Sequence, residues 1–248
     1  MTALSINLNK IALIRNSRAG DYPNILDFAN TCIDCGVDGI TVHPRPDQRH
    51  IRPDDVRQLA TLVAPLDEVE FNIEGNPLAD ACGDYPGLVS LVEETLPDQC
   101  TLVPDSDSQL TSDHGFDLNK QGEQLTPIIN KIKSMGVRVS LFMDPDLDQI
   151  KLASDVGADR IELYTGPFAA AWGSEHQDSY FEQHLLAAQL ATSLGLGVNA
   201  GHDLNLKNLG QYASIPGLLE VSIGHAFTVD SLNMGMIPAL RAYQTLLA

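Results

Sequence analysis

The sequence is poor in basic residues. Its 248 residues contain 15 lysines and arginines against 33 aspartates and glutamates, which gives a formal net charge of −18. This balance argues against a nucleic-acid-binding protein and against docking on anionic lipid, because both partners require a basic surface. Small anionic ligands remain compatible with it, since a few arginines and histidines dominate the field at short range.

Long apolar runs are absent and cysteines are few. No stretch approaches the roughly 18 consecutive apolar residues of a membrane span, and the first residues, MTALSINLNKIALIRNSR, do not resemble a secretory signal. We therefore expect a cytoplasmic protein. Cys32 and Cys35 form a CxxC motif inside a helical pattern. Because no second pair with metal-ligand spacing follows, we expect reduced, mostly buried thiols.

Short β-branched apolar runs recur along the whole chain. They predict eight strands, at residues 4–8, 39–42, 69–73, 100–103, 137–143, 160–164, 196–199 and 218–223. Amphipathic patterns predict helices between or after them, at residues 22–35, 54–63, 119–135, 146–156, 180–194 and 229–247. Nearly continuous apolar strands are typical of a parallel sheet that is buried on both faces.

Several predicted helices end in a glycine that leads directly into the next strand, as in CGVDGITV and MGVRVSLF. Eight strand–helix units in about 250 residues predict an α/β fold, a single-domain (β/α)8 barrel with parallel strands over residues 1–248. An open doubly wound sheet is the alternative, but no glycine-rich GxGxxG turn follows the first strand.

Polar side chains follow the predicted strands, where a barrel carries its active site. His43, Glu74 and His202 each follow an apolar strand and are suited to proton transfer. Five of the seven histidines and a group of arginines fall in these segments, which favours a phosphorylated substrate: His43, His50, His114, His202, His225, Arg15, Arg18, Arg45, Arg49 and Arg52.

Two further features bear on the chemistry. The polar segment from Asp105 to Gly115 is long enough to act as a closing lid over the site. No HxH or HExxH spacing is present, and arginine neighbours would repel a cation. We therefore expect no metal.

The strand-end segments resemble the pyridoxine 5′-phosphate synthase family of vitamin B6 biosynthesis. The matching strings, in chain order, are NLNKIALIRNSRAG, DGITVHPRPDQRHI, EFNIEGNP, TLVPD, RIELYTGP, GLGVNAGHDLN and EVSIGHA. The resemblance implies a barrel enzyme of the transferase class. It would condense 1-deoxy-D-xylulose 5-phosphate with 3-amino-2-oxopropyl phosphate to give pyridoxine 5′-phosphate, phosphate and water.

The resemblance also implies roles for single residues. His43 and Glu74 would accept protons and His202 would donate one. Arg45, His50 and Thr111 would bind the deoxyxylulose phosphate. The aminooxopropyl phosphate would contact Asn7, Arg18, Gly224 and His225. The family implies no cofactor, and it implies a homo-octamer built from dimers that binds small phosphorylated substrates.

Three positions depart from the family pattern. Asn9-Lys10 stands where many members carry Asp-His, and Asp203 replaces a glycine after the catalytic histidine. By resemblance these residues are still expected to contact substrate. Two other functions stay open: another phosphosugar lyase or aldolase on the same barrel, and a non-catalytic barrel that binds phosphorylated metabolites. A Schiff-base aldolase would need a lysine on the sixth strand, which reads Glu162-Leu163-Tyr164.

Overall fold

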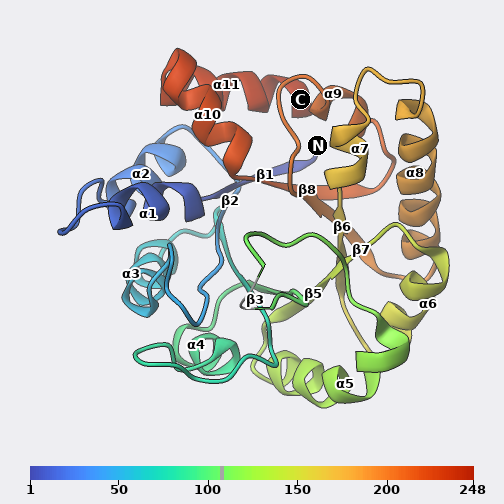
Figure 1. Ribbon diagram of the computed structural model, residues 1–248, viewed down its shortest axis with the longest axis horizontal. Coiled ribbons are helices and arrows are strands. Elements are labelled where there is room, and N and C mark those ends of the chain that lie inside the picture. Colours follow the sequence, from blue (N-terminus) through green and yellow to red (C-terminus); the bar gives the residue numbers. More distant parts are fainter. Residues whose placement is uncertain (107–108) are drawn as a thin grey trace.

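The structure is a computed structural model that describes residues 1–106 and 109–248. Within them, eight parallel strands close into a barrel in chain order, so that β8 pairs with β1 (Figure 1). The strands are β1 (Ala3–Asn7), β2 (Gly39–Val42), β3 (Glu70–Gly75), β4 (Gln99–Leu102), β5 (Arg138–Met143), β6 (Arg160–Tyr164), β7 (Gly197–Gly201) and β8 (Leu218–Ile223). The predicted (β/α)8 barrel is confirmed.

Helices surround the barrel. They are α1 (Asn9–Asn16), α2 (Ile25–Asp34), α3 (Pro53–Val63), α4 (Leu88–Thr95), α5 (Leu118–Ser134), α6 (Leu147–Asp155), α7 (Gly166–Ala170), α8 (Gln177–Ser193), α9 (Leu209–Tyr212), α10 (His225–Met234) and α11 (Met236–Leu247). The expectation of one last helix over 229–247 is wrong, because Gly235 adopts a φ of 91° and separates α10 from α11. The sequence patterns also failed to predict the short helices α1, α4, α7 and α9.

The barrel wall separates an apolar layer from a polar interior. Alternate strand residues such as Leu4, Ile40 and Val139 are buried among the helices. The other residues of the strands place hydroxyls and amides inside the barrel, where the Ser5 and Thr41 hydroxyls lie 2.7 Å apart and Thr101 donates to Asn72. The apolar layer holds the helices on the barrel, while the interior is held by hydrogen bonds.

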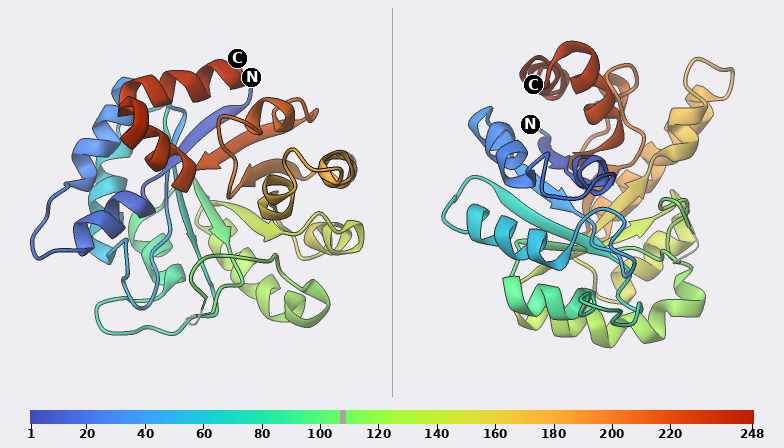
Figure 2. Two further views of the ribbon diagram at one scale, coloured as in Figure 1. Left: turned by 45° about the horizontal axis from the view of Figure 1, so that its top comes forward. Right: turned by 60° about the vertical axis from the view of Figure 1, so that its left-hand side comes forward.

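The amino-terminal ends of the strands carry a network of paired charges. Arg160 contacts Glu220 at 3.3 Å and Asn199 at 3.1 Å, and Arg138 forms an ion pair with Glu70. A cavity of about 230 Å³ at this end is lined by Glu70, Arg160 and Glu220 together with residues of neighbouring segments. The two chain termini lie close to each other in both views of Figure 2.

Two sequence expectations concern the whole chain. Cys32, Cys35 and Cys100 are buried free thiols and Cys82 is exposed, as expected from the isolated CxxC motif. Burial raises the pKa of Cys32 to about 12, which makes its thiol unreactive at neutral pH. None of the helices within residues 1–106 and 109–248 is long and apolar enough to cross a membrane.

Candidate active site

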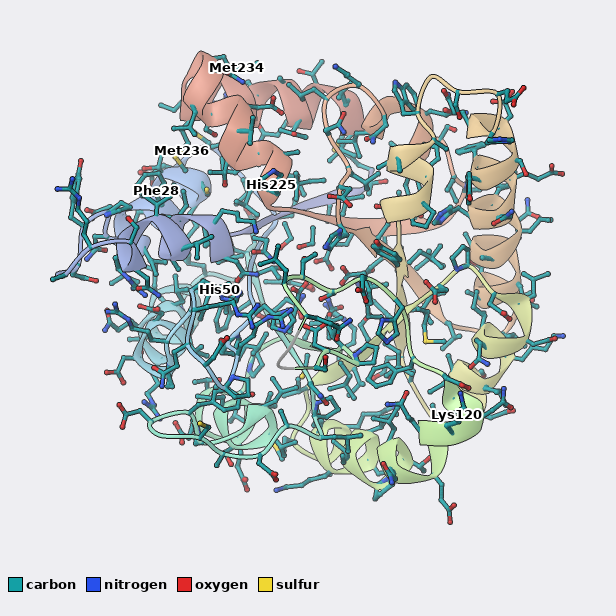
Figure 3. The ribbon with its side chains drawn as sticks, viewed as in Figure 1. Phe28, His50, Lys120, His225, Met234 and Met236 are labelled. Atoms are coloured by element: carbon teal, nitrogen blue, oxygen red, sulfur yellow. The ribbon has the colours of Figure 1, made fainter. Side chains whose placement is uncertain are left out.

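A cavity of about 330 Å³ opens at the carboxyl ends of the strands. Of the thirteen site residues predicted from the sequence, all but Arg18 line it. Figure 3 labels two of them, His50 before α3 and His225 at the first position of α10. Other segments add Glu162, Ser112, Phe142 and Ser222 to the wall. Residues from most of the eight strand ends therefore converge on one space.

The end of β1 supports the neighbouring strands. The Asn7 amide donates to Glu74 Oε2 at 3.3 Å, and its carbonyl oxygen accepts from the backbone N–H of Asn9. Asn9 in turn accepts a hydrogen bond from the backbone N–H of His43 at 2.9 Å. Asn9 thus holds the backbone at His43 in place. The amide oxygen of an asparagine can accept this hydrogen bond, as can the carboxylate of an aspartate.

His43 lies between two carboxylates. Its Nε2 is 3.1 Å from Asp105 Oδ2, and its Nδ1 is 3.7 Å from Glu74 Oε2. Burial by itself lowers the pKa of His43, but the interactions with the Asp105 and Glu74 carboxylates outweigh it, so the pKa lies above its ordinary value. The result is a buried imidazole that is a stronger base than free histidine.

His50 has the opposite electrostatic environment. Burial, together with the charges of His43 and Arg45, lowers the pKa of His50 to about 3. Its Nδ1 accepts the backbone N–H of Ile51 at 2.9 Å. His50 is therefore neutral at physiological pH with the proton on Nε2, which makes that nitrogen a hydrogen-bond donor.

His202 is oriented by a partner on each nitrogen. Nε2 lies 2.8 Å from Thr111 Oγ1, and Nδ1 lies 3.0 Å from Asp203 Oδ2. His202 and Asp203 both adopt left-handed backbone conformations, with φ of 75° and 52°. The hydroxyl of Thr165 donates to the carbonyls of Gly201 and His202 and so anchors this turn from the end of β6.

The described part of the segment after β4 passes across the barrel mouth (Figure 1). Besides the contact of Thr111 with His202, Arg49 donates from Nη1 to the carbonyls of Gln109 and Leu110 at 2.7 and 3.2 Å. Residues 107–108 of the predicted lid lie outside the described residues. The described part contacts two other loops of the site, while a closing motion on ligand binding stays a prediction.

Gly224 and His225 begin α10 at the end of β8. The free N–H groups of the first helical turn give this ten-residue helix a positive end, which favours a bound anion. A Cβ at position 224 would lie 3.1 Å from the Asn7 Cβ, so glycine keeps β1 and β8 close at this point.

Sequence reasoning missed two buried carboxyl groups near the cavity. Glu162 on β6 faces the cavity, and burial, followed by the charges of Glu74 and Glu220, raises its pKa well above the ordinary value. Asp105 contacts His43 and Arg45 from behind the cavity wall. Their positions at the ends of strands were visible in the sequence, but their partners come from strands distant in the chain.

Arg18 lies outside the cavity, in the segment after α1. The predicted contact of Arg18 with substrate thus has no counterpart in the cavity of this single chain. Among the residues that the structure describes, no group of three or more His, Cys, Asp or Glu side chains is arranged to hold a metal ion.

The fold and the site define a class: (β/α)8-barrel enzymes that combine acid–base groups with cationic sites for phosphorylated substrates. Solved structures share this architecture at low sequence identity. For 3-hexulose-6-phosphate synthase from Salmonella typhimurium the TM-score is 0.66 with 18% identity, covering 99% of this chain and 98% of that one. At this identity the likeness shows the fold alone.

Sequence comparison is more specific. The family model described as pyridoxal phosphate biosynthesis protein PdxJ matches residues 4–248. Pyridoxine 5′-phosphate synthase from Xanthomonas axonopodis pv. citri is 54% identical over 99% of this chain and 96% of its own length. The enzyme of the same name from Xylella fastidiosa is 51% identical, with 99% and 95% covered. The chain belongs to the PdxJ family of pyridoxal phosphate biosynthesis proteins.

Proposed function

We propose that this protein is a pyridoxine 5′-phosphate synthase, which condenses 1-deoxy-D-xylulose 5-phosphate with 3-amino-2-oxopropyl phosphate. The products are pyridoxine 5′-phosphate, phosphate and water. Family membership over residues 4–248 supports the reaction. The single structural observation that supports it most is one cavity that holds both a set of acid–base side chains and two distinct regions that can donate hydrogen bonds to a phosphate.

The two regions suit the phosphates of the two substrates. Arg45, His50 and Thr111 form the first, where the guanidinium and the neutral His50 both donate hydrogen bonds. Asn7, Gly224 and His225 form the second, at the amino-terminal end of α10. In a cavity of about 330 Å³, both bound substrates lie close to the same catalytic side chains.

The reaction closes a ring through an imine, a new carbon–carbon bond, loss of water and loss of phosphate. Each of these steps moves protons, so groups of different basicity are needed at one place. His43 and Glu74 accept protons in this proposal and His202 donates one. Glu162 adds a buried carboxyl group whose raised pKa favours the protonated form, which can donate a proton.

Three residues that depart from the family pattern take modified roles. Asn9 supports the backbone of His43. Lys10 lines the cavity, where it supplies a cation to the substrate phosphates. The hydrogen bond with His202 lowers the pKa of Asp203, and with the charges of His225 and Lys10 it outweighs the opposing effect of burial. The Asp203 carboxylate therefore stays ionised among cations.

The remaining properties belong to the same proposal. The enzyme acts in the cytoplasm as one domain over residues 1–248, without metal or organic cofactor and without a nucleic-acid partner. It assembles as a homo-octamer, which the family resemblance implies. Exposed apolar side chains on α1, α10 and α11 support assembly: Leu13, Ile14, Val229, Leu232, Met234 and Ile237. Sedimentation at eight times the chain mass of 26.8 kDa would be the expected result.

The proposed function is tested by incubating the purified protein with both substrates. We expect pyridoxine 5′-phosphate by absorbance and mass, with one phosphate released for each molecule formed, and no product when either substrate is left out. Cleavage of one phosphosugar alone would indicate a lyase or aldolase instead. Binding of both substrates without any turnover would indicate a non-catalytic barrel.

A further inference from the structure

We propose that Asp105 is a positioning residue for the reaction, and that one buried carboxylate oxygen holds both the His43 imidazole and the Arg45 guanidinium in their working orientations. The inference rests on the proposed function, because it assigns Asp105 a role through two residues of that site. Asp105 does not line the cavity. It therefore acts on the substrates through side chains that do line it, of which His43 and Arg45 carry the chemistry.

The geometry around Asp105 is closely constrained. Its Oδ2 accepts a hydrogen bond from Arg45 Nη2 at 2.5 Å and lies 3.1 Å from His43 Nε2. The hydroxyl of Ser112 also hydrogen-bonds its carboxylate, and the Asn76 amide donates to its backbone carbonyl at 2.6 Å. The Asp105 side chain is only 5% exposed. A carboxylate held by this many partners has one orientation.

This orientation determines which nitrogen of His43 exchanges protons. Because Asp105 Oδ2 can only accept a hydrogen bond, it keeps a proton on Nε2 of the neutral ring. The lone pair then lies on Nδ1, on the side of Glu74 Oε2. Among the residues that the structure describes, the ionisable groups around the ring are Asp105, Glu74, Arg45 and His50. Of these, the two carboxylates favour the protonated ring.

The same oxygen restrains Arg45. One guanidinium nitrogen is bound to Asp105, and Arg45 also lines the cavity, where its planar guanidinium can donate to a substrate phosphate. A substrate phosphate must compete with Asp105 for part of this charge. Removing the Asp105 charge should therefore leave the binding of deoxyxylulose phosphate equal or tighter, while proton transfer through His43 becomes slower.

The test is the Asp105→Asn variant, which keeps the shape of the side chain and removes its charge. We expect kcat to fall by about 10–100-fold, because a misoriented His43 loses its alignment with the reacting atoms. KM for 1-deoxy-D-xylulose 5-phosphate should be unchanged or lower. The limb of the pH–rate profile that reports His43 should move to lower pH. Asp105→Glu should regain most of the lost kcat.

Asp113→Asn is the matched control. Asp113 lies on the same segment and contacts His114 Nδ1 at 2.6 Å, but both side chains are more than half exposed and neither lines the cavity. This variant should stay within about twofold of the unchanged protein. If the role of Asp105 were purely structural, Asp105→Asn would lower the melting temperature and leave the pH–rate profile unchanged. It would then also not show a fall in kcat that is separate from the effect on KM.

NMR titration of ¹³Cε1-labelled histidine gives a readout that does not depend on turnover. In the unmodified protein His43 should titrate above 6.5, with its neutral form protonated on Nε2, and in Asp105→Asn at a lower pH. An unchanged midpoint in Asp105→Asn would overturn the inference. A His43 that titrates at or below 6.5 in the unmodified protein would also overturn it, and this second result does not depend on the folding of Asp105→Asn. Absence of pyridoxine 5′-phosphate formation by the unmodified protein would overturn the proposed function instead.

Discussion

The two ends of the barrel both carry clusters of charged side chains, but the charges are arranged differently. At the amino-terminal end Arg160 pairs with Glu220 and Arg138 pairs with Glu70, so each arginine has a carboxylate partner. At the carboxyl end the Asp105 carboxylate contacts both His43 and Arg45. Glu162 faces the cavity, and the charged neighbours that raise its pKa are the carboxyl groups of Glu74 and Glu220. At the amino-terminal end the arginines and carboxylates pair with one another, whereas at the carboxyl end His43, Glu74 and Glu162 line the cavity in which the substrates are proposed to bind.

We interpret the charged groups at the amino-terminal end as structural and those at the carboxyl end as catalytic. Buried ion pairs are costly to break and contribute little net stability when intact. Groups with shifted pKa values beside a cavity are the usual mark of proton-transfer chemistry. The comparison predicts that substitutions at the amino-terminal end change stability, and that substitutions at the carboxyl end change turnover.

The largest expected effect is at the carboxyl end. Glu74→Gln keeps the shape and hydrogen bonding of the side chain but removes a proton acceptor, so we expect turnover to fall by about 10²–10⁴-fold. Binding of the phosphorylated substrates, measured by calorimetry, should stay within a few-fold of normal. Near-normal turnover of Glu74→Gln would remove this residue from the mechanism.

Arg160→Met should act on stability instead. It leaves Glu220 buried without its cation, which costs about 3–5 kcal/mol for a broken buried pair. We expect this loss of unfolding free energy, measured with denaturant, to be larger at pH 8 than at pH 5, because Glu220 takes up a proton at the lower pH. Turnover per folded molecule should stay normal. A loss of turnover without a loss of stability would contradict the division between the two ends.

Glu220 also gives the unmodified protein a pH dependence. Burial raises the pKa of Glu220 from 4.5 to about 7. The folded state therefore holds a proton that the unfolded state has released between these values, and stability falls as pH rises from 4.5 to 7. This contribution is about 3 kcal/mol, because a tenfold difference in proton affinity corresponds to about 1.4 kcal/mol. In Glu220→Gln the slope of unfolding free energy over this window should be weaker; an equal slope would rule out Glu220 as its source.

The smallest effect is expected at Asp203. Its φ of 52° suits glycine, so Asp203→Gly should leave the melting temperature unchanged or slightly higher. His202 loses its partner on Nδ1, and we expect kcat to fall by about fivefold, the value of one hydrogen bond of about 1 kcal/mol. Asp203→Asn, which also tolerates this backbone conformation, serves as the control for charge. Unchanged kcat in both variants would mean that Thr111 alone orients His202.

Much of the fold and of the site was predictable from local sequence signals. Apolar runs at a regular spacing predict the eight strands, and polar residues after them predict His43, Glu74 and His202, because a barrel places all strand ends on one rim. The break at Gly235 was missed because apolar residues occur on both sides of it and the glycine by itself does not reveal its positive φ. The role of Asp105 depends on Arg45, sixty positions away, and no local pattern reports such a pairing.

The central claim is that the carboxyl end of the barrel, and not the amino-terminal end, binds the phosphorylated substrates. A crystal structure of Glu74→Gln with 1-deoxy-D-xylulose 5-phosphate tests it most directly, since this variant should bind the substrate without consuming it. We predict that the phosphate lies within hydrogen-bond distance of Arg45, His50 and Thr111. A phosphate bound between Arg138 and Arg160 at the opposite end would contradict the account.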